Sequence, residues 1–230
     1  TWPDWVEVSF AHQAFPLGTT HAVLCARSAV GDGPFGVVNG DDIYGRDALQ
    51  LLSERLIGGQ NLLVAFRLGQ TVLTADPVTR GVTITDASGR LTGLAERRKV
   101  ARNPDGTFTS GDGLEPASLN PDALVSMNLW GFQPDIWDFF QEAVVQDHPE
   151  IGPDGALIDP SRPPANENET LLPEVVGNAL SAGRINLELA AASGSCVGVT
   201  HADDLPVAQG VLAKMISSGD RSEWLWERPH

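Results

Sequence analysis

The chain has 230 residues, of which 42% are apolar and 20% are charged, a composition typical of a folded globular protein and not of a disordered segment. Its formal net charge of −15 argues against duplex nucleic acid or a membrane surface as partner, because both bind basic patches. A small phosphate-bearing substrate stays compatible with this charge, since it needs only a few local cations and a divalent metal ion. We expect a single domain covering residues 1–230.

Cysteine usage and the terminal sequence indicate the compartment. Cys25 and Cys196 lie far apart in apolar stretches and make no disulfide framework, so we expect two reduced, buried thiols. The sequence contains neither a signal peptide nor an apolar run long enough to span a bilayer, and we expect a cytoplasmic protein. The chain does not begin with Met and enters a strand-like pattern at once, which indicates a preceding segment or a processed start.

The first half of the chain predicts strands alternating with helices. Val6, Val8 and Phe10 alternate with polar residues, a pattern typical of a half-buried strand. The Asp-Ala-Ser-Gly sequence at 86–89 indicates a hairpin turn. The other elements predicted here are a helix over 22–29, a buried strand over 34–38, a helix over 46–56, a strand over 62–67, and hairpin strands over 81–85 and 90–96.

The second half continues the alternation around two long polar segments. Its predicted elements are a loop over 102–122, a strand over 125–131, a helix over 134–145, a loop over 148–170, a helix over 173–182, strands over 185–189 and 197–200, and a helix over 205–218. This order favours an α/β three-layer sandwich with a mixed sheet. In such sheets ligands bind beyond the carboxyl ends of the strands, so residues that follow strands are the first site candidates.

Two carboxylates, Asp41 and Asp42, follow the predicted strand of residues 34–38. Mg²⁺ prefers oxygen ligands and is commonly held by one or two carboxylates together with substrate phosphates. Taken alone, however, the pair fits a strand-to-helix turn better, because Asp and Gly are common in such turns.

A loop of small residues around Gly18 precedes the helix predicted over 22–29. Backbone amides exposed at such a point can bind a base or a phosphate. The alternative is a helix cap, in which Thr19 or Thr20 only starts the helix.

The densest basic cluster of this acidic chain is Glu-Arg-Arg-Lys at 96–99. Arg97 and Lys99 at a strand end suit an anionic phosphate, and Glu96 suits sugar hydroxyls. The alternative is a solvated run of charges, which is the commoner meaning of such a cluster.

The order and spacing of these segments carry more information than any one of them. The chain resembles the sugar-1-phosphate nucleotidyltransferases, the group that contains glucose-1-phosphate thymidylyl- and uridylyltransferases. The segments that carry the resemblance are Gly-Thr-Thr-His-Ala at 18–22, Asn-Gly-Asp-Asp-Ile-Tyr-Gly at 39–45, Ala-Glu-Arg-Arg-Lys at 95–99 and Val-Ser-Met-Asn-Leu-Trp-Gly-Phe at 125–132. Segments 171–176, 197–201 and 224–226 look like a bacterial branch of that group.

The resemblance implies a Rossmann-like, glycosyltransferase-A-type nucleotidyltransferase fold. It implies a Mg²⁺-dependent enzyme that joins a nucleoside triphosphate to a sugar 1-phosphate, giving a nucleotide sugar and pyrophosphate. Carried over position by position, it assigns catalytic roles to Asp41, Arg97 and Lys99, and metal binding to Asp41 and Asp42. It assigns nucleotide binding to Gln13, Gly18 and Thr19, and sugar binding to Gly81, Glu96 and Asn128. Because the attacking phosphate oxygen is already anionic, no general base is required, and we interpret His12 and His21 as packing or capping residues.

Two expectations about geometry follow from the resemblance. Asp41 is expected at the carboxyl end of a central strand, with its carboxylate facing an open cleft. Glu96, Arg97 and Lys99 are expected to approach the same cleft as Asn128.

The sequence also departs from the family in two places. The family opens with a strand and a glycine-rich loop whose Arg and Lys bind the triphosphate, and we expect this N-terminal βα unit to be missing. The second metal-binding aspartate of the thymidylyltransferases would fall close to Gly198, so Asp203 or Asp204 is the candidate stand-in.

Three functions therefore stay open. They are the nucleotidyltransferase, a degenerate domain that binds a nucleotide or sugar phosphate without turnover, and a glycosyltransferase that uses a nucleotide sugar. Residues 39–45 favour the first, and an assay of pyrophosphate release separates all three. A sheet without its first βα unit would expose a strand edge, so we expect little turnover by the chain alone and contact with its own N-terminal piece or a second copy.

Overall fold

The computed structural model describes residues 3–73, 76–199 and 202–223. An eight-stranded mixed sheet runs in the order β7-β6-β5-β4-β8-β3-β9, with β1 paired to β8, and β3–β9 is its parallel pair. Its strands are β1 (Phe35–Val37), β3 (Leu62–Arg67), β4 (Val78–Thr85), β5 (Leu91–Arg102), β6 (Phe108–Ser110), β7 (Ser118–Leu119), β8 (Leu124–Phe132) and β9 (Glu188–Ala191). A small second sheet pairs β2 (Asp42–Ile43) with β10 (Val197–Gly198).

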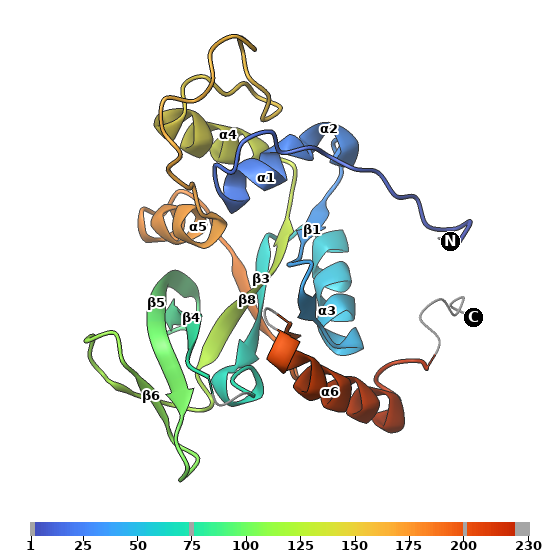
Figure 1. Cartoon of the computed structure of the whole chain (residues 1–230), viewed down its shortest axis with the longest axis vertical. Coiled ribbons are helices and arrows are strands. Elements are labelled where there is room, and N and C mark those ends of the chain that lie inside the picture. Colours follow the sequence, from blue (N-terminus) through green and yellow to red (C-terminus); the bar gives the residue numbers. More distant parts are fainter. Residues whose placement is uncertain (1–2, 74–75, 200–201, 224–230) are drawn as a thin grey trace.

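Helices cover both faces of the large sheet, which confirms the expected α/β architecture with a mixed sheet (Figure 1). The helices are α1 (Thr19–Cys25), α2 (Arg27–Val30), α3 (Arg46–Ile57), α4 (Ile136–Asp147), α5 (Leu172–Ser181) and α6 (Leu205–Ser218), with short 3₁₀ turns η1 (Leu68–Gln70) and η2 (Ala202–Asp204). No helix in the described part of the chain is long and apolar enough to cross a membrane.

Strand β3 shows how the sequence sorts the two faces of the sheet. Successive side chains of a strand point to opposite faces. Leu63 and Ala65 pack into the core beneath α1, α4 and α5, whereas Leu62, Val64 and Phe66 pack into the core beneath α3. An uninterrupted apolar strand of this kind is typical of a sheet that is buried on both faces.

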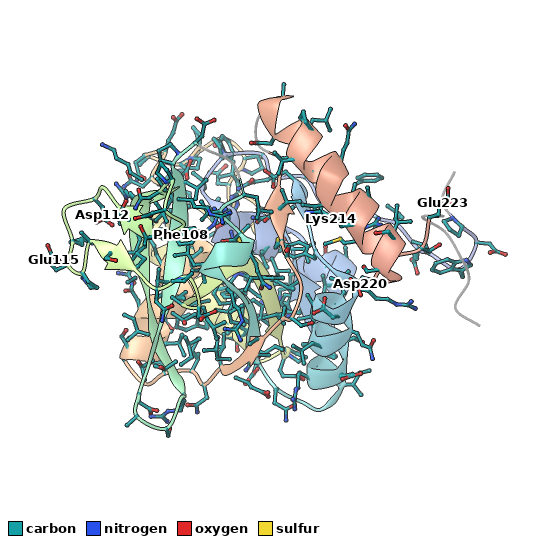
Figure 2. The ribbon with its side chains drawn as sticks, turned by 90° about the horizontal axis from the view of Figure 1, so that it is seen from below. Phe108, Asp112, Glu115, Lys214, Asp220 and Glu223 are labelled. Atoms are coloured by element: carbon teal, nitrogen blue, oxygen red, sulfur yellow. The ribbon has the colours of Figure 1, made fainter. Side chains whose placement is uncertain are left out.

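The polar segment 102–122, expected to be a loop, contains two strands. β6 pairs with β5 and β7 pairs with β6, which extends the sheet beyond β5. Phe108 and Leu119 pack there in a third apolar cluster. Figure 2 labels Phe108 in this part of the sheet. A few apolar residues among many polar ones were enough to form these two short strands, because the neighbouring strands supply hydrogen-bond partners for their backbones.

The N-terminal strand expected at residues 6–10 is absent from the structure, where residues 6–13 form neither strand nor helix. Phe10 is 90% exposed, so the alternating side chains cover no core. A strand is stable only when a neighbour hydrogen-bonds with it, and no strand pairing includes this segment in the described residues. The helix expected over 22–29 is also divided, into α1 and α2.

Both cysteines are free thiols, as expected. Cys196 is buried in the core beneath α3, whereas Cys25 is half-buried, so the expectation of burial is wrong for Cys25.

Candidate functional site

A cleft opens where two strands separate along one edge of β8. β1 pairs with residues 130–132 of β8, and β4 pairs with residues 125 and 126 along the same edge. Residues 127–129 pair with neither strand, so the sheet is open between them. Residues 126–128 line a cleft of about 640 Å³ at this opening. Ligand sites of α/β sheets commonly lie where neighbouring strands diverge.

The backbone of β8 bulges at the same point. The β3–β8 register jumps from Leu63↔Trp130 to Ala65↔Ser126, so three residues of β8 lie opposite one of β3. Asn128, at the centre of this bulge, has a φ of 54°, a left-handed conformation that Asn adopts more readily than most residues. Bulges of this kind commonly redirect a side chain beside an active site.

The side chain of Asn128 lines the cleft with a fixed orientation. The indole Nε1 of Trp130 donates a hydrogen bond to Asn128 Oδ1 at 3.2 Å. Because Trp130 is fully buried, this contact holds the amide oxygen in place. The Nδ2 group of Asn128 then offers its two donors to a ligand in the cleft.

The residues assigned to the sugar share this cleft. Gly81 of β4 pairs with Glu96 of β5 on one side and with Ser126 of β8 on the other, and all three residues line the cleft. The expectation that Glu96 and Asn128 approach one cleft is therefore confirmed. These residues lie within strands and not at strand ends, because the bulge and the separation of β1 from β4 open the middle of the sheet.

The acidic pair follows β1, with Asp41 in the turn between β1 and β2 and Asp42 as the first residue of β2. Asp41 and Asp42 both line the cleft, and the backbone of Asp41 is held by Val199 N, which donates to Asp41 O at 2.8 Å. β1 has three residues and pairs only with the end of β8, so the expectation of a central strand before Asp41 is wrong. Asp41 lies at a cleft, as expected, and the direction of its carboxylate stays a prediction.

Asp42 is held more tightly than Asp41. Asn39 Nδ2 donates to Asp42 Oδ2 at 2.9 Å, and the Tyr44 hydroxyl lies 3.2 Å from the same oxygen. That hydroxyl is also 2.6 Å from Met127 O, the better acceptor for its single proton. Burial raises the pKa of Asp42, and the hydrogen bond from Asn39 opposes this rise.

The acidic pair fits a divalent cation in chemistry. Carboxylate oxygens are the ligands that Mg²⁺ prefers, and a cation would offset the cost of a buried Asp42 carboxylate. Across residues 3–73, 76–199 and 202–223, no cluster of three His, Cys, Asp or Glu side chains has the arrangement of a metal site.

Arg97 lies on the other side of β5 and does not reach the cleft. Its Nε donates to Asp112 Oδ2 at 2.8 Å, and its Nη2 donates to Leu114 O and Pro116 O at 2.9 and 3.0 Å. Both members of the ion pair are buried, with side chains 6% and 5% exposed. Figure 2 shows Asp112 near β6, on the side of the molecule away from α6.

The structure therefore contradicts the prediction that Arg97 or Lys99 meets the sugar phosphate. The alternation of side chains along β5 turns Arg97 away from the face that Glu96 occupies. Lys99 is exposed and does not line the cleft. The cation that does line it is Arg80, which no sequence motif singled out.

The residues assigned to the nucleotide lie outside the cleft lining, beside the start of α5. Gly18 has a φ of 93°, and a Cβ at this position would lie 2.5 Å from Thr170 N. Thr19 Oγ1 accepts a hydrogen bond from Leu172 N at 2.8 Å, and Gln13 Nε2 donates to Gly18 O at 3.1 Å. These contacts give the loop a structural role, and its contact with a nucleotide stays a prediction.

The two histidines near this loop differ. His21 is fully buried, with Nε2 2.8 Å from Gly155 O and Nδ1 3.1 Å from Gln13 Nε2, which confirms a packing role. His12 is exposed, which contradicts a packing role for it.

The structure describes one of the two candidates for the second metal-binding aspartate. Gly198 and Asp204 both line the cleft, so Asp204 lies near the expected stand-in position. The side chain of Asp203 lies outside the described part of the chain.

Comparison with known proteins gives relatives of one kind. No family model matches the chain. A 40-residue stretch is 50% identical to the UTP–glucose-1-phosphate uridylyltransferase YngB of Bacillus subtilis (strain 168), covering 17% of this chain and 14% of that protein. The solved UDP-glucose pyrophosphorylase from Acinetobacter baumanii is 16% identical, with a TM-score of 0.52 over 94% of this chain and 62% of that one.

Two further solved structures agree. An apo UDP-glucose pyrophosphorylase is 16% identical with a TM-score of 0.52, over 90% of this chain and 63% of that one. A UDP-glucose pyrophosphorylase complexed with UDP-glucose is 16% identical with a TM-score of 0.51, over 90% of this chain and 66% of that one. The chain thus has the fold of these pyrophosphorylases and spans between 62% and 66% of their length.

Proposed function

We propose that the protein is a sugar-1-phosphate nucleotidyltransferase that forms a nucleotide sugar and pyrophosphate. One observation carries the proposal. Asp41, Gly81, Glu96 and Asn128 come from four separate segments and line a single cleft. The fold shared with UDP-glucose pyrophosphorylases supports it, as does the matching stretch of a uridylyltransferase. A uridine nucleotide and a glucose phosphate are accordingly the first substrates to test.

The reaction would need positioning and charge neutralisation and no general base. An oxygen of the sugar phosphate attacks the α-phosphorus of the nucleoside triphosphate, the bond to the β-phosphate breaks, and pyrophosphate leaves. In this proposal Glu96 accepts hydrogen bonds from sugar hydroxyls, and Asn128 donates one through Nδ2. Asp41 and Asp42 would hold Mg²⁺, which when bound neutralises charge at the reacting phosphates.

The experiment is an assay of pyrophosphate release by the protein as its gene encodes it, because we expect little turnover by the 230 residues alone, with Mg²⁺, glucose 1-phosphate and each nucleoside triphosphate in turn. Asp41→Asn keeps the size of the side chain and removes its charge, so we expect turnover to fall by about 10²–10³-fold. Asp32→Asn is the matched control, because Asp32 is exposed and does not line the cleft. Equal rates for the two variants would contradict the proposed site.

A second candidate function is a domain that binds the same compounds without turnover. The contacts of Arg97 favour it, since a cation assigned to catalysis is held in an ion pair away from the cleft. Titration calorimetry with UDP-glucose separates the two candidates. Binding together with pyrophosphate release supports the enzyme, and binding without release under every substrate pair supports the binding domain.

A further inference from the structure

The cleft has an acidic lining that is unfavourable for a phosphate. Its lining carboxylates come from several elements and are those of Asp41, Asp42, Glu96, Glu174 and Asp204. Of the described residues that line it, Arg80 alone carries a basic side chain. Among the described residues, a phosphate group entering this cleft therefore meets one basic side chain, that of Arg80.

Arg80 is held in a fixed orientation with donors to spare. Its Nε donates to Thr71 Oγ1 at 3.2 Å, its Nη2 to Thr71 O at 2.7 Å and its Nη1 to Thr79 O at 2.9 Å. A guanidinium has five N–H donors. These three bonds leave one N–H on each terminal nitrogen as a donor for phosphate oxygens.

The support beneath Arg80 is rigid. Thr71 is 4% exposed, and its own hydroxyl donates to Leu68 O at 3.1 Å. Burial lowers the pKa of Arg80 and the carboxylate of Asp42 raises it, and an arginine stays charged at neutral pH under both influences. The charge is therefore preorganised, which favours binding because little conformational freedom is lost.

The position of Arg80 suits the phosphate of a sugar 1-phosphate. Arg80 pairs with Arg97 across β4 and β5, so its side chain leaves the strand on the face opposite to that of Glu96. It nevertheless lines the same cleft as Gly81, Glu96 and Ser126. Asp41 and Asp42 line this cleft as well. The guanidinium thus shares one cleft with the residues assigned to the sugar and with the acidic pair, and we expect the phosphate that joins the two halves of the reaction in this cleft.

The neighbouring cations are poorer candidates. Arg97 is buried in an ion pair with Asp112, bonds two carbonyl oxygens and does not line the cleft. Arg98 is 71% exposed and pairs with Glu96, its Nε donating to Glu96 Oε1 at 2.6 Å. Arg98 is therefore the rival to exclude by experiment.

We propose that Arg80 binds the phosphate group of the sugar 1-phosphate, through the N–H donors that Thr71 and Thr79 leave unused. The identification of the ligand as a sugar 1-phosphate rests on the proposed function. The assignment of Arg80 to a phosphate rests on the cleft itself, so the two can fail separately.

The test is titration calorimetry of the full chain with glucose 1-phosphate and, separately, with inorganic phosphate, in buffer containing a metal chelator. Arg80→Gln should weaken the binding of both anions by about tenfold or more, as expected for a charge-assisted pair of hydrogen bonds. Arg102→Gln, an exposed arginine outside the cleft, should leave both affinities unchanged. Arg80→Lys keeps the positive charge but lacks the branched donors of a guanidinium, so it should weaken the binding of both anions several-fold. This variant serves as the test if Arg80→Gln does not fold.

The outcomes are distinct. Folded Arg80→Gln with wild-type affinity for both anions overturns the inference, as does a loss of binding in Arg98→Gln and not in Arg80→Gln. If Arg80→Gln does not fold, wild-type affinity in Arg80→Lys overturns it. Arg80-dependent binding of inorganic phosphate without binding of glucose 1-phosphate or UDP-glucose supports Arg80 as a phosphate ligand and contradicts the proposed function. A wild-type chain that binds none of these compounds contradicts both.

Discussion

Asn128 shows how one residue can combine a backbone and a ligand role. Its φ of 54° lies in a region that costs most residues about 1–2 kcal/mol, and it does so within a strand. The bulge places its side chain in the cleft, and Trp130 fixes the orientation of its amide. Strained backbone that is maintained by its surroundings is often found at functional sites.

A pair of substitutions separates these two roles. Asn128→Gly and Asn128→Ala both remove the amide, so each should weaken binding of glucose 1-phosphate by roughly tenfold. Asn128→Ala should also be less stable than Asn128→Gly by about 1 kcal/mol, because Gly alone adopts the left-handed conformation without strain. Calorimetry measures the first effect and urea denaturation the second. Undiminished binding in Asn128→Gly would remove Asn128 from the site.

At the scale of elements, the segment before α1 is joined to the segment before α5. Thr170 N donates to Leu17 O at 2.9 Å, and Thr20 N donates to Thr170 O at 3.0 Å. Gly18 lies between these two bonds with a φ of 93° and a ψ of 176°, a conformation that is almost restricted to Gly. The close approach of the two backbones leaves no room for a side chain.

Gly18→Ala should therefore destabilise the fold more than Gly31→Ala does. Gly31 has a similar conformation, with a φ of 74° and a ψ of −153°, and a Cβ there would meet no atom within 4 Å. Gly31→Ala carries the conformational cost alone, whereas Gly18→Ala adds a steric clash of about 1–3 kcal/mol. Urea denaturation of both variants measures the difference, and equal destabilisation would argue against the close packing at Gly18.

The ion pair between Arg97 and Asp112 makes a second prediction at this scale, about pH. Hydrogen bonds from Arg97 hold the pKa of Asp112 well below its usual range. A lowered pKa contributes stability that is present above the usual Asp pKa, about 3.9, and is lost as the pH falls towards the folded-state pKa.

Asp112→Asn should therefore be less stable than the wild type at pH 7, and this difference should shrink as the pH is lowered below about 4. Denaturation curves between pH 3 and pH 7 measure it, with Asp122→Asn as the control, because the pair of Asp122 with Arg67 is exposed. A difference in stability that does not change with pH would contradict the role of the ion pair.

At the scale of the whole molecule, periodicity predicted the elements that depend on local sequence. The helix expected over 205–218 has those bounds in the structure, ending at Gly219 in a left-handed cap. The hairpin turn at 86–89 is also as expected, with Asp86 N donating to Arg90 O at 3.0 Å. Pairings between distant segments were missed, such as β6 with β7, because they depend on neighbours that local patterns do not reveal.

The site was predicted in part for the same reason. The resemblance brought Asp41, Glu96 and Asn128 to one cleft, since motif order reflects the arrangement of strands. The error at Arg97 was avoidable, because strand periodicity alone separates it from Glu96. Arg80 was not predictable locally. Its importance comes from Thr71, which supports it from another segment, and from the acidic lining around it.

The central claim is that the cleft between β1 and β4 binds a nucleotide sugar. A crystal structure of the chain with bound UDP-glucose tests it most directly. We expect the hexose to lie beside Glu96 and Asn128, and the diphosphate to lie between Arg80 and Asp41. UDP-glucose bound elsewhere on the molecule, or no binding in solution or crystal at saturating concentration, would contradict it.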